Sequence, residues 1–221
     1  MDLTILLPAL NEVEAIGPLL DEIQRDVKVP HTVLVIDSDS TDGTDSIALN
    51  HKAVLMRVRK EGKGAAVRSG LHMVGTPYVI MMNSDYTYPA GYVNWMYDRL
   101  KNSRADVVIG HRDIVDKGAM AFVNSVGNWL LSLEASILYN TRVYDVCSGM
   151  WGFRTEVLKQ FRLTSKGFTL EADLFVNTVK SRRQLQQIPI AYRARLGGSR
   201  PKLQVRDGLK IGWFLLKRRF S

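Results

Sequence analysis

The chain has 221 residues, a net charge of +8, 46% hydrophobic residues and a single cysteine, Cys147. This composition excludes a disordered or fibrous chain, and one cysteine excludes an intrachain disulfide. No apolar run reaches the roughly 18 residues of a membrane span, and the N-terminal residues lack the pattern of a signal peptide. We therefore expect one cytoplasmic domain spanning residues 1–221.

The first 110 residues alternate between β-branched apolar runs and amphipathic stretches. Strands are predicted at 3–7, 32–37, 53–58, 78–82 and 106–109, and helices at 16–27, 44–50, 64–73 and 92–101. This alternation is typical of an α/β fold with a parallel sheet and helices on both faces. Ligands of such sheets bind beyond the carboxyl ends of the strands, so the loops after the first four strands should meet at one rim.

Beyond residue 110 the alternation weakens. Apolar residues recur every three or four positions between 119 and 139, while Asn124, Asn128, Ser132 and Ser136 repeat every four on another face. That pattern predicts one long amphipathic helix. A second helix is predicted at 169–181, a strand at 185–190 and, after a Gly- and Arg-rich loop, a last helix from 203 to the end.

Three of the polar loops contain residue types that suit a nucleotide. Asp37 is a carboxylate at the end of an apolar strand and could accept a hydrogen bond from a nucleobase N–H, although residues 40–44 are ordinary turn residues. The glycines around Lys63 either allow a phosphate to approach or only mark the start of a helix. Asp85 is either a turn former or a carboxylate that helps a divalent ion neutralise a departing diphosphate.

Seven segments, taken together and in order, resemble a known family. They are LPALNE, VIDSDSTDGT, GKGAAVRSG, NSDYTYP, DVCSGMWGFR, GFTLEADL and RLGGSRPKL. This series is similar to the inverting family 2 glycosyltransferases, above all to the dolichyl- or polyprenyl-phosphate sugar synthases, including archaeal enzymes of N-glycan assembly. The resemblance implies a GT-A nucleotide-diphospho-sugar transferase fold, with a nucleotide-sugar half at 1–110 and an acceptor half at 111–221.

The resemblance also implies a donor site with a metal ion, Mg²⁺ or Mn²⁺. The residues implied for the nucleotide-sugar are Pro8, Ala9, Asn11, Glu12, Asp37, Lys63, Asn83 and Asp85. Asp85 matches the second carboxylate of the metal motif, and Asn83 stands in place of the first. Because an amide brings no negative charge to a metal, Asn83 is a departure from the family pattern. Ser38 and Thr87 are further departures, in place of Asp and Gln.

The acceptor phosphate is expected to meet basic residues of the second half. The resemblance implies Arg112, Ser125 and Arg195, with Lys202 and Arg200 able to assist and Arg193 as a rival to Arg195. A phosphomonoester is largely a dianion near pH 7, so it needs arginines rather than a strong base. A hydroxyl acceptor would need a carboxylate base, for which Asp173, and also Glu171, are the candidates.

The last helix carries an apolar stripe of Leu209, Trp213, Leu216 and Phe220, flanked by Arg206, Lys210 and Lys217. This arrangement predicts a helix lying among anionic lipid headgroups, with the 119–139 helix as a second contact. The alternative is a terminal helix whose stripe packs on the core. We expect peripheral attachment at the cytoplasmic face of the membrane, or reliance on a separate membrane-protein partner.

Three functions remain open at this point. The first is transfer of a sugar, with inversion, from a UDP- or GDP-linked donor to dolichyl or polyprenyl phosphate. The second is a family 2 glycosyltransferase acting on a hydroxyl acceptor, either a glycan or a small molecule. The third is a non-catalytic nucleotide- or nucleic-acid-binding module that uses the +8 charge. We rank them in this order and expect no nucleic-acid partner.

Overall fold

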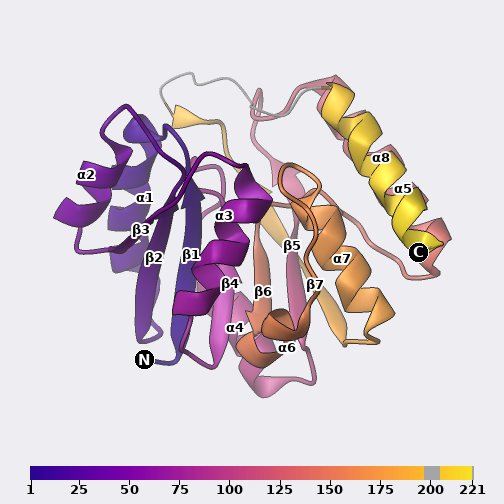
Figure 1. Cartoon of the computed structure of the whole chain (residues 1–221), viewed down its shortest axis with the longest axis horizontal. Coiled ribbons are helices and arrows are strands. Elements are labelled where there is room, and N and C mark those ends of the chain that lie inside the picture. The colour runs from indigo at the N-terminus through magenta and orange to yellow at the C-terminus, as the bar shows by residue number, and fades with distance from the viewer. Residues whose placement is uncertain (197–204, 221) are drawn as a thin grey trace.

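The computed structural model describes residues 1–196 and 205–220, and it is built on a single seven-stranded sheet (Figure 1). The strands are β1 (Leu3–Ala9), β2 (His31–Asp37), β3 (Val54–Arg57), β4 (Tyr78–Met81), β5 (Val107–Val115), β6 (Trp151–Arg154) and β7 (Leu185–Tyr192). Their order in the sheet is β3-β2-β1-β4-β6-β5-β7. All neighbours pair in parallel except β6, which runs antiparallel to both β4 and β5.

The helices cover both faces of this sheet. They are α1 (Val13–Asp26), α2 (Thr44–Asn50), α3 (Lys63–Gly70), α4 (Tyr92–Asn102), α5 (Phe122–Tyr139), α6 (Thr155–Gln160), α7 (Leu170–Lys180) and α8 (Val205–Arg219), with a short 3₁₀ turn, η1 (Leu71–Met73). The predicted α/β class and the mostly parallel sheet are confirmed. β6 and α6 were missed by the sequence analysis, because each is shorter than seven residues and too short to show a period.

Period-two alternation along the strands builds two cores, one on each face of the sheet. In β1, Leu6 belongs to the core that contains residues of α3, α6 and α7, whereas Ile5 and Leu7 belong to the core that contains residues of α1, α2 and α4. The same alternation separates Val79 from Ile80 in β4. The central strands are therefore buried on both sides, and polar residues can gather only at their ends.

Helices α5 and α8 lie side by side at one end of the molecule (Figure 1). Ile211 and Leu215 of α8 are buried, and the Tyr139 hydroxyl of α5 donates a hydrogen bond to the Leu215 carbonyl at 2.9 Å. Gly212 faces α5 closely enough that a Cβ there would lie 2.9 Å from Glu134 Oε2. One face of α8 is thus fixed to the protein.

The predicted apolar stripe lies on the opposite face of α8. Leu209, Trp213, Leu216 and Phe220 are 38–81% exposed, so the alternative in which this stripe packs on the core is wrong. On α5, large apolar side chains are also exposed, namely Phe122, Val126, Trp129, Leu133 and Ile137. Across residues 1–196 and 205–220, we find no helix that is long and apolar enough to cross a bilayer.

The neighbouring leucines of α8 provide a matched test of this packing. Leu215→Ala should lower the free energy of unfolding by about 2–5 kcal/mol, because it leaves a cavity beside α5. Leu216→Ala should cost far less, since this side chain is 38% exposed. Urea denaturation measures both values, and equal losses would contradict the orientation of the helix.

Candidate functional site

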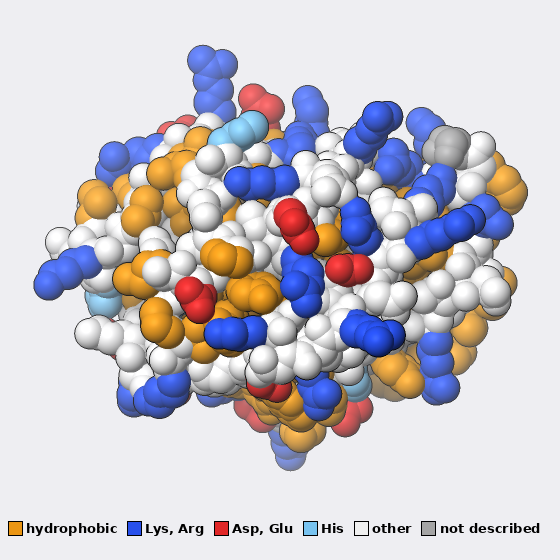
Figure 2. Space-filling model, turned by 90° about the horizontal axis from the view of Figure 1, so that it is seen from below, with side chains coloured by type: hydrophobic (Ala, Val, Ile, Leu, Met, Phe, Trp, Pro, Cys, Tyr) orange, Lys and Arg blue, Asp and Glu red, His pale blue; other side chains and the backbone are white. Residues whose placement is uncertain are grey.

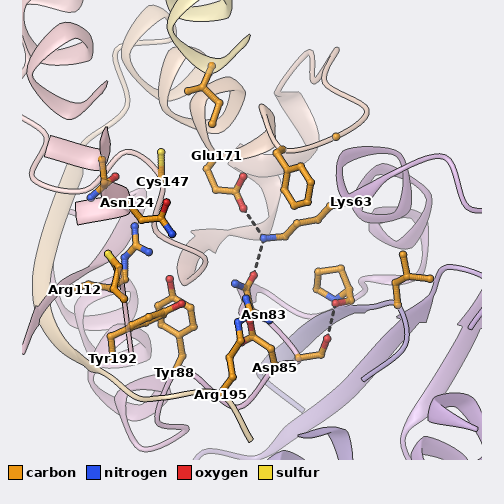
Figure 3. A pocket seen from close by; sticks show the side chains of 18 of the residues that line it. Lys63, Asn83, Asp85, Tyr88, Arg112, Asn124, Cys147, Glu171, Tyr192 and Arg195 are labelled. Atoms are coloured by element: carbon orange, nitrogen blue, oxygen red, sulfur yellow. Dashed lines mark hydrogen bonds and ion pairs between the residues drawn. The ribbon is translucent and has the colours of Figure 1, made fainter. Parts of the chain in front are cut away.

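A cleft of about 590 Å³ opens at the carboxyl ends of β1, β2 and β4. The first half of the chain contributes Pro8, Ala9, Glu12, Ser38, Lys63, Asn83 and Asp85, and the second half contributes Arg112, Asn124, Glu171 and Arg195. In Figure 3, Lys63 and Glu171 lie on one side of the cleft and Arg112 and Asn124 on the other, with Asn83, Asp85 and Arg195 between them. The predicted convergence of the strand-end loops is thus what the structure shows.

Asp85 joins the two halves of the chain across the floor of this cleft. Its side chain lies in the loop that follows β4, and Oδ2 forms an ion pair with Arg195 Nη2 at 2.6 Å. Oδ1 accepts a hydrogen bond from the buried Thr87 hydroxyl at 2.6 Å. The intervening residue, Tyr86, has a φ of 63°, so the chain turns sharply after the strand. Asp85 is only 4% exposed, yet both of its oxygens have hydrogen-bond donors.

Lys63 forms a second charged cluster beside this ion pair. Its ammonium group donates to Asn83 Oδ1 at 2.7 Å and to Glu171 Oε1 of α7. Lys63 is the first residue of α3, so the helix start holds the ammonium group at the cleft. Asn83 presents its oxygen to a cation of the protein, and Glu171, which had been considered as a base, is an ion-pair partner instead.

The two glycines that flank Lys63 are required by protein packing. Gly62 has a φ of +103°, and a Cβ on it would collide with the Lys166 carbonyl oxygen. A Cβ on Gly64 would meet the Ser165 carbonyl oxygen in the same way. The segment before α7 therefore packs directly on the start of α3, and the N–H of Ala65 donates to the Lys166 carbonyl at 3.2 Å. Of the two interpretations of this motif, the structure supports the start of a helix.

Arg112 occupies the far side of the cleft and is held by a buried carboxylate. Nε and Nη2 bind the two oxygens of Asp145 at 2.6 and 2.7 Å, and the guanidinium lies over the Tyr192 ring, 5.2 Å from its centre. Burial alone would lower the pKa of Arg112, but Asp145 outweighs it and raises that pKa. Burial would raise the pKa of Asp145, yet Arg112 lowers it. Both groups are therefore charged at neutral pH.

Four predicted site residues do not line the cleft. Asn11 is exposed, and its Oδ1 accepts a hydrogen bond from the N–H of Thr41. Asp37 is buried; Oδ2 accepts from the N–H of Ser40 at 3.0 Å, while Oδ1 has no hydrogen-bond partner. Ser125 points outward from α5, whereas the preceding residue, Asn124, lines the cleft.

The fourth, Asp173, is fully buried, and its place does not support a role as a catalytic base. Oδ2 accepts hydrogen bonds from the backbone N–H groups of Thr164 and Ser165 at 2.6 and 2.9 Å. Oδ1 accepts from Asn177 and lies 3.5 Å from Arg218 of α8. Asp173 therefore fixes the segment that packs on α3.

Of the two rival arginines after β7, the structure brings Arg195 to the cleft. Arg193 forms a two-pronged ion pair with the buried Glu22 of α1, at 2.7 and 3.1 Å, and does not line the cleft. Lys202 and Arg200, the other predicted phosphate ligands, lie outside the described residues.

Sequence reasoning missed an apolar part of the cleft wall. It is formed by Met120, Val123, Leu131, Phe168 and Ile211, which come from α5 and the residue pair before it, the loop before α7, and α8. The repeat of Asn124 and Asn128 was an available signal, because both amides turn out to line the same wall. The apolar residues gave no comparable signal, since helix packing alone explains their spacing.

The side chains that were expected to hold a metal ion are already bound to other groups. Asp85 accepts from Arg195 and Thr87, and Asn83 accepts from Lys63. In the part of the chain that the structure describes, no three His, Cys, Asp or Glu side chains come together as a metal site would require. Asp85 and Asn83 therefore do not form a preassembled site for Mg²⁺ or Mn²⁺.

The fold and the cleft together are those of an α/β enzyme whose active site lies at the carboxyl ends of the strands. Comparisons with known proteins define the family to which the chain belongs. The model of glycosyl transferase family 2 matches residues 4–162. Two similar proteins from Haloferax volcanii are glycosyltransferase AglJ, 35% identical over 92% of this chain and 67% of its own length, and a dolichyl-phosphate hexose transferase, 32% identical over 89% of this chain and 85% of its own.

Solved structures confirm the fold. Glucosyl-3-phosphoglycerate synthase from Mycobacterium tuberculosis, in complex with Mn²⁺, uridine-diphosphate and glucosyl-3-phosphoglycerate, has a TM-score of 0.78 and is 22% identical, covering 99% of this chain and 80% of that chain. The architecture is thus the predicted GT-A fold. The chain belongs to glycosyl transferase family 2 and is a glycosyltransferase.

The buried pair of Arg112 and Asp145 gives a stability prediction with a defined pH dependence. Because the pKa of Asp145 is lowered in the folded state, the pair stabilises the protein above about pH 4 and loses this contribution as the pH falls through the folded pKa. Asp145→Asn should lower the free energy of unfolding by about 3 kcal/mol at pH 7 and by less at pH 3.

Urea denaturation at the two pH values measures this difference. Asp45→Asn is the matched control, because Asp45 pairs with Arg57 at the surface and its replacement should change little. A loss for Asp145→Asn that is the same at both pH values would contradict the assignment.

Proposed function

We propose that this enzyme transfers a sugar, with inversion, from a UDP- or GDP-linked donor to dolichyl or polyprenyl phosphate at the cytoplasmic face of the membrane. One observation carries the proposal: a single cleft combines a charged floor, two arginines and an apolar wall. Asp85 and Lys63 form the floor, Arg112 and Arg195 supply the positive charge, and α5 and α8 supply the apolar wall. A lipid phosphate has the matching combination of an anionic head and an apolar chain.

The donor half of the cleft suits a nucleotide. Pro8, Ala9 and Ser38 line it at the ends of β1 and β2, and Asp37 lies buried just beneath, with one carboxylate oxygen unpartnered. An unsatisfied buried acceptor costs free energy, but for a nucleobase N–H to donate to this oxygen the nucleotide must first expose it, because Asp37 does not line the cleft. Glucosyl-3-phosphoglycerate synthase has been crystallised with uridine-diphosphate-glucose in the same fold, which supports a nucleotide-sugar donor.

The chemistry expected here requires little from a general base. A phosphate oxygen of the acceptor attacks the anomeric carbon, a new carbon–oxygen bond forms, and the bond to the nucleoside diphosphate breaks on the opposite side, which inverts the configuration. Around pH 7 the acceptor is already largely a dianion. Arg112, fixed by Asp145, and Arg195 would orient it, and Arg195, where it also meets the donor diphosphate, would reduce the repulsion between the two substrates.

The two carboxylates that were candidates for a base, together with Asp85, also favour a phosphate over a hydroxyl acceptor. Asp173 is buried away from the cleft, Glu171 is paired with Lys63, and Asp85 is paired with Arg195. A hydroxyl acceptor needs a carboxylate that is able to take up a proton. The H. volcanii relative named as a dolichyl-phosphate hexose transferase supports the same choice.

The exposed apolar faces of α5 and α8 support attachment to a membrane. Trp129 of α5 and Trp213 of α8 are more than 60% exposed, and Lys210 and Lys217 flank the stripe of α8. Aromatic and aliphatic residues beside cations suit the headgroup region of an anionic bilayer. The cleft wall uses the same two helices, so a lipid could reach the arginines from the bilayer.

The surface opposite the cleft does not favour the nucleic-acid alternative. Figure 2 shows the molecule from below, where the parallel strands begin, and Lys and Arg side chains are scattered there among hydrophobic, acidic and uncharged surface. A single-strand binding groove would bring cations and aromatic residues together along one path. The +8 charge is therefore better explained by an anionic lipid surface and phosphorylated substrates.

The proposed transfer can be tested directly. Purified protein is incubated with radiolabelled UDP- and GDP-sugars, polyprenyl phosphate and a divalent cation, and the lipid product is extracted into organic solvent. We expect one donor to label the lipid, and Asp85→Ala to reduce the rate at least about 100-fold, because Arg195 loses its partner at the reacting phosphates.

Asp45→Ala serves as the control for this experiment, since Asp45 is a surface residue that does not line the cleft. Its activity should equal that of the unmodified chain. Label transferred only to a water-soluble acceptor would replace the lipid proposal with the hydroxyl alternative.

Membrane attachment predicts a second result. Flotation with vesicles of anionic lipid should recover the protein, and Trp213→Ala with Phe220→Ala should reduce the bound fraction several-fold without loss of thermal stability, because both side chains are exposed. The matched variant, Leu49→Ala, removes an exposed apolar residue of α2 and should bind like the unmodified chain. Equal binding by all three proteins would remove α8 from the interface.

A further inference from the structure

Two cations of the protein lie where the diphosphate of a donor would meet the strand ends. Lys63 and Arg195 both line the cleft, and each side chain is 17% exposed. Each of them binds a residue of the loop that follows β4, which contains Asn83 and Asp85. Lys63 binds Asn83 at 2.7 Å and Arg195 binds Asp85 at 2.6 Å. The positive charge at this point is therefore part of the chain and is held in place by hydrogen bonds.

We propose that Lys63 and Arg195 bind the donor diphosphate themselves, and that Asn83 lets the chain bind its nucleotide with little dependence on a divalent cation. This inference rests on the proposed function, because it concerns the donor of that reaction. It differs from the sequence-based expectation, in which Asp85 and Asn83 hold Mg²⁺ or Mn²⁺.

The first step is the charge balance around Lys63. Its ammonium group faces one carboxylate, Glu171, and one neutral amide, Asn83. An aspartate at position 83 would place two carboxylates on the same ammonium group and leave the cluster with a net negative charge. With asparagine the cluster is neutral, and an ammonium group has a third N–H to offer to a phosphate oxygen.

The second step concerns the oxygens that a metal ion would need. Oδ2 of Asp85 forms the ion pair with Arg195, and Oδ1 accepts from Thr87. A divalent cation at Asp85 would have to displace the Arg195 guanidinium and would also lie close to the Lys63 ammonium. Repulsion between like charges is strong in a partly buried cleft, because water screens it less there.

The third step concerns the way in which the neighbouring backbone restricts the position of the Asn83 side chain. The backbone at Gly149 lies directly against the Asn83 amide, since a Cβ at Gly149 would collide with it. The N–H of Gly149 in turn donates to the Tyr88 hydroxyl at 2.7 Å, which anchors this backbone. The Asn83 amide is thus held in place beside Lys63, and its Oδ1 helps to hold the Lys63 ammonium group at the cleft.

The inference is tested by equilibrium binding of UDP and GDP, measured by titration calorimetry in EDTA and in MnCl₂. For the unmodified chain, we expect the Kd of the preferred nucleotide to differ less than about threefold between the two conditions. Asn83→Asp, an isosteric change, should bind at least about tenfold more tightly in MnCl₂ than in EDTA. Lys63→Met should weaken binding in EDTA at least about tenfold, because it removes a charge-assisted hydrogen bond.

Lys101→Met is the control for the charge change, since Lys101 lies on α4 and does not line the cleft; its nucleotide affinity should not change. Electron paramagnetic resonance of free Mn²⁺ gives a readout without nucleotide, and Asn83→Asp should bind Mn²⁺ at least about tenfold more tightly than the unmodified chain. Thermal unfolding confirms that each variant is folded.

Two outcomes would overturn the inference in different ways. If the unmodified chain binds nucleotide only with Mn²⁺, or if Asn83→Asp has the same ratio of affinities as the unmodified chain, the role of Lys63 and Asn83 is wrong while the proposed transferase stands. If neither nucleotide binds under any condition, the inference and the proposed function fail together.

Discussion

The ion pair between Asp85 and Arg195 is the contact on which the arrangement of the site depends. Asp85 lies in the loop after β4, and Arg195 follows β7, so the pair joins the two halves of the chain across the cleft. Because Asp85 is almost fully buried and Thr87 fixes its other oxygen, the guanidinium is held in one place. A group of the loop after β4 and a group of the basic C-terminal region therefore meet at one point of the cleft.

Packing around the segment before α7 fixes the backbone that carries these charged groups. Asp173 fixes the segment before α7, that segment lies against the glycines of α3, and the start of α3 holds Lys63 at the cleft. Each link depends on a carboxylate or a glycine that does not itself face the substrate. Residues around the site thus fall into two groups: those that offer charge to a ligand, and those that fix the backbone from which the charge is offered.

The sequence predicted much of the fold, because alternation of strands and helices in residues 1–110 is a strong periodic signal. It also brought Asp85, Lys63, Arg112 and Arg195 to one cleft, since all of them follow strands or match family motifs. It could not find β6, whose four residues carry no period, nor decide between Arg193 and Arg195, which depends on the distant Glu22. The burial of Asp173 was equally out of reach, because hydrogen bonds from Thr164 and Ser165 depend on tertiary structure.

The contact between Asp173 and Arg218 connects the outermost helix to the interior of the enzyme. Arg218 lies in the last turn of α8, only two residues before the end of the described chain, and its guanidinium reaches a carboxylate with no exposure to solvent. A chain trimmed by four residues would lose this cation and leave the carboxylate with fewer donors. Shortening the C-terminus, a routine step in preparing crystals, would thus disturb the backbone beneath Lys63 as well as the helix that was cut.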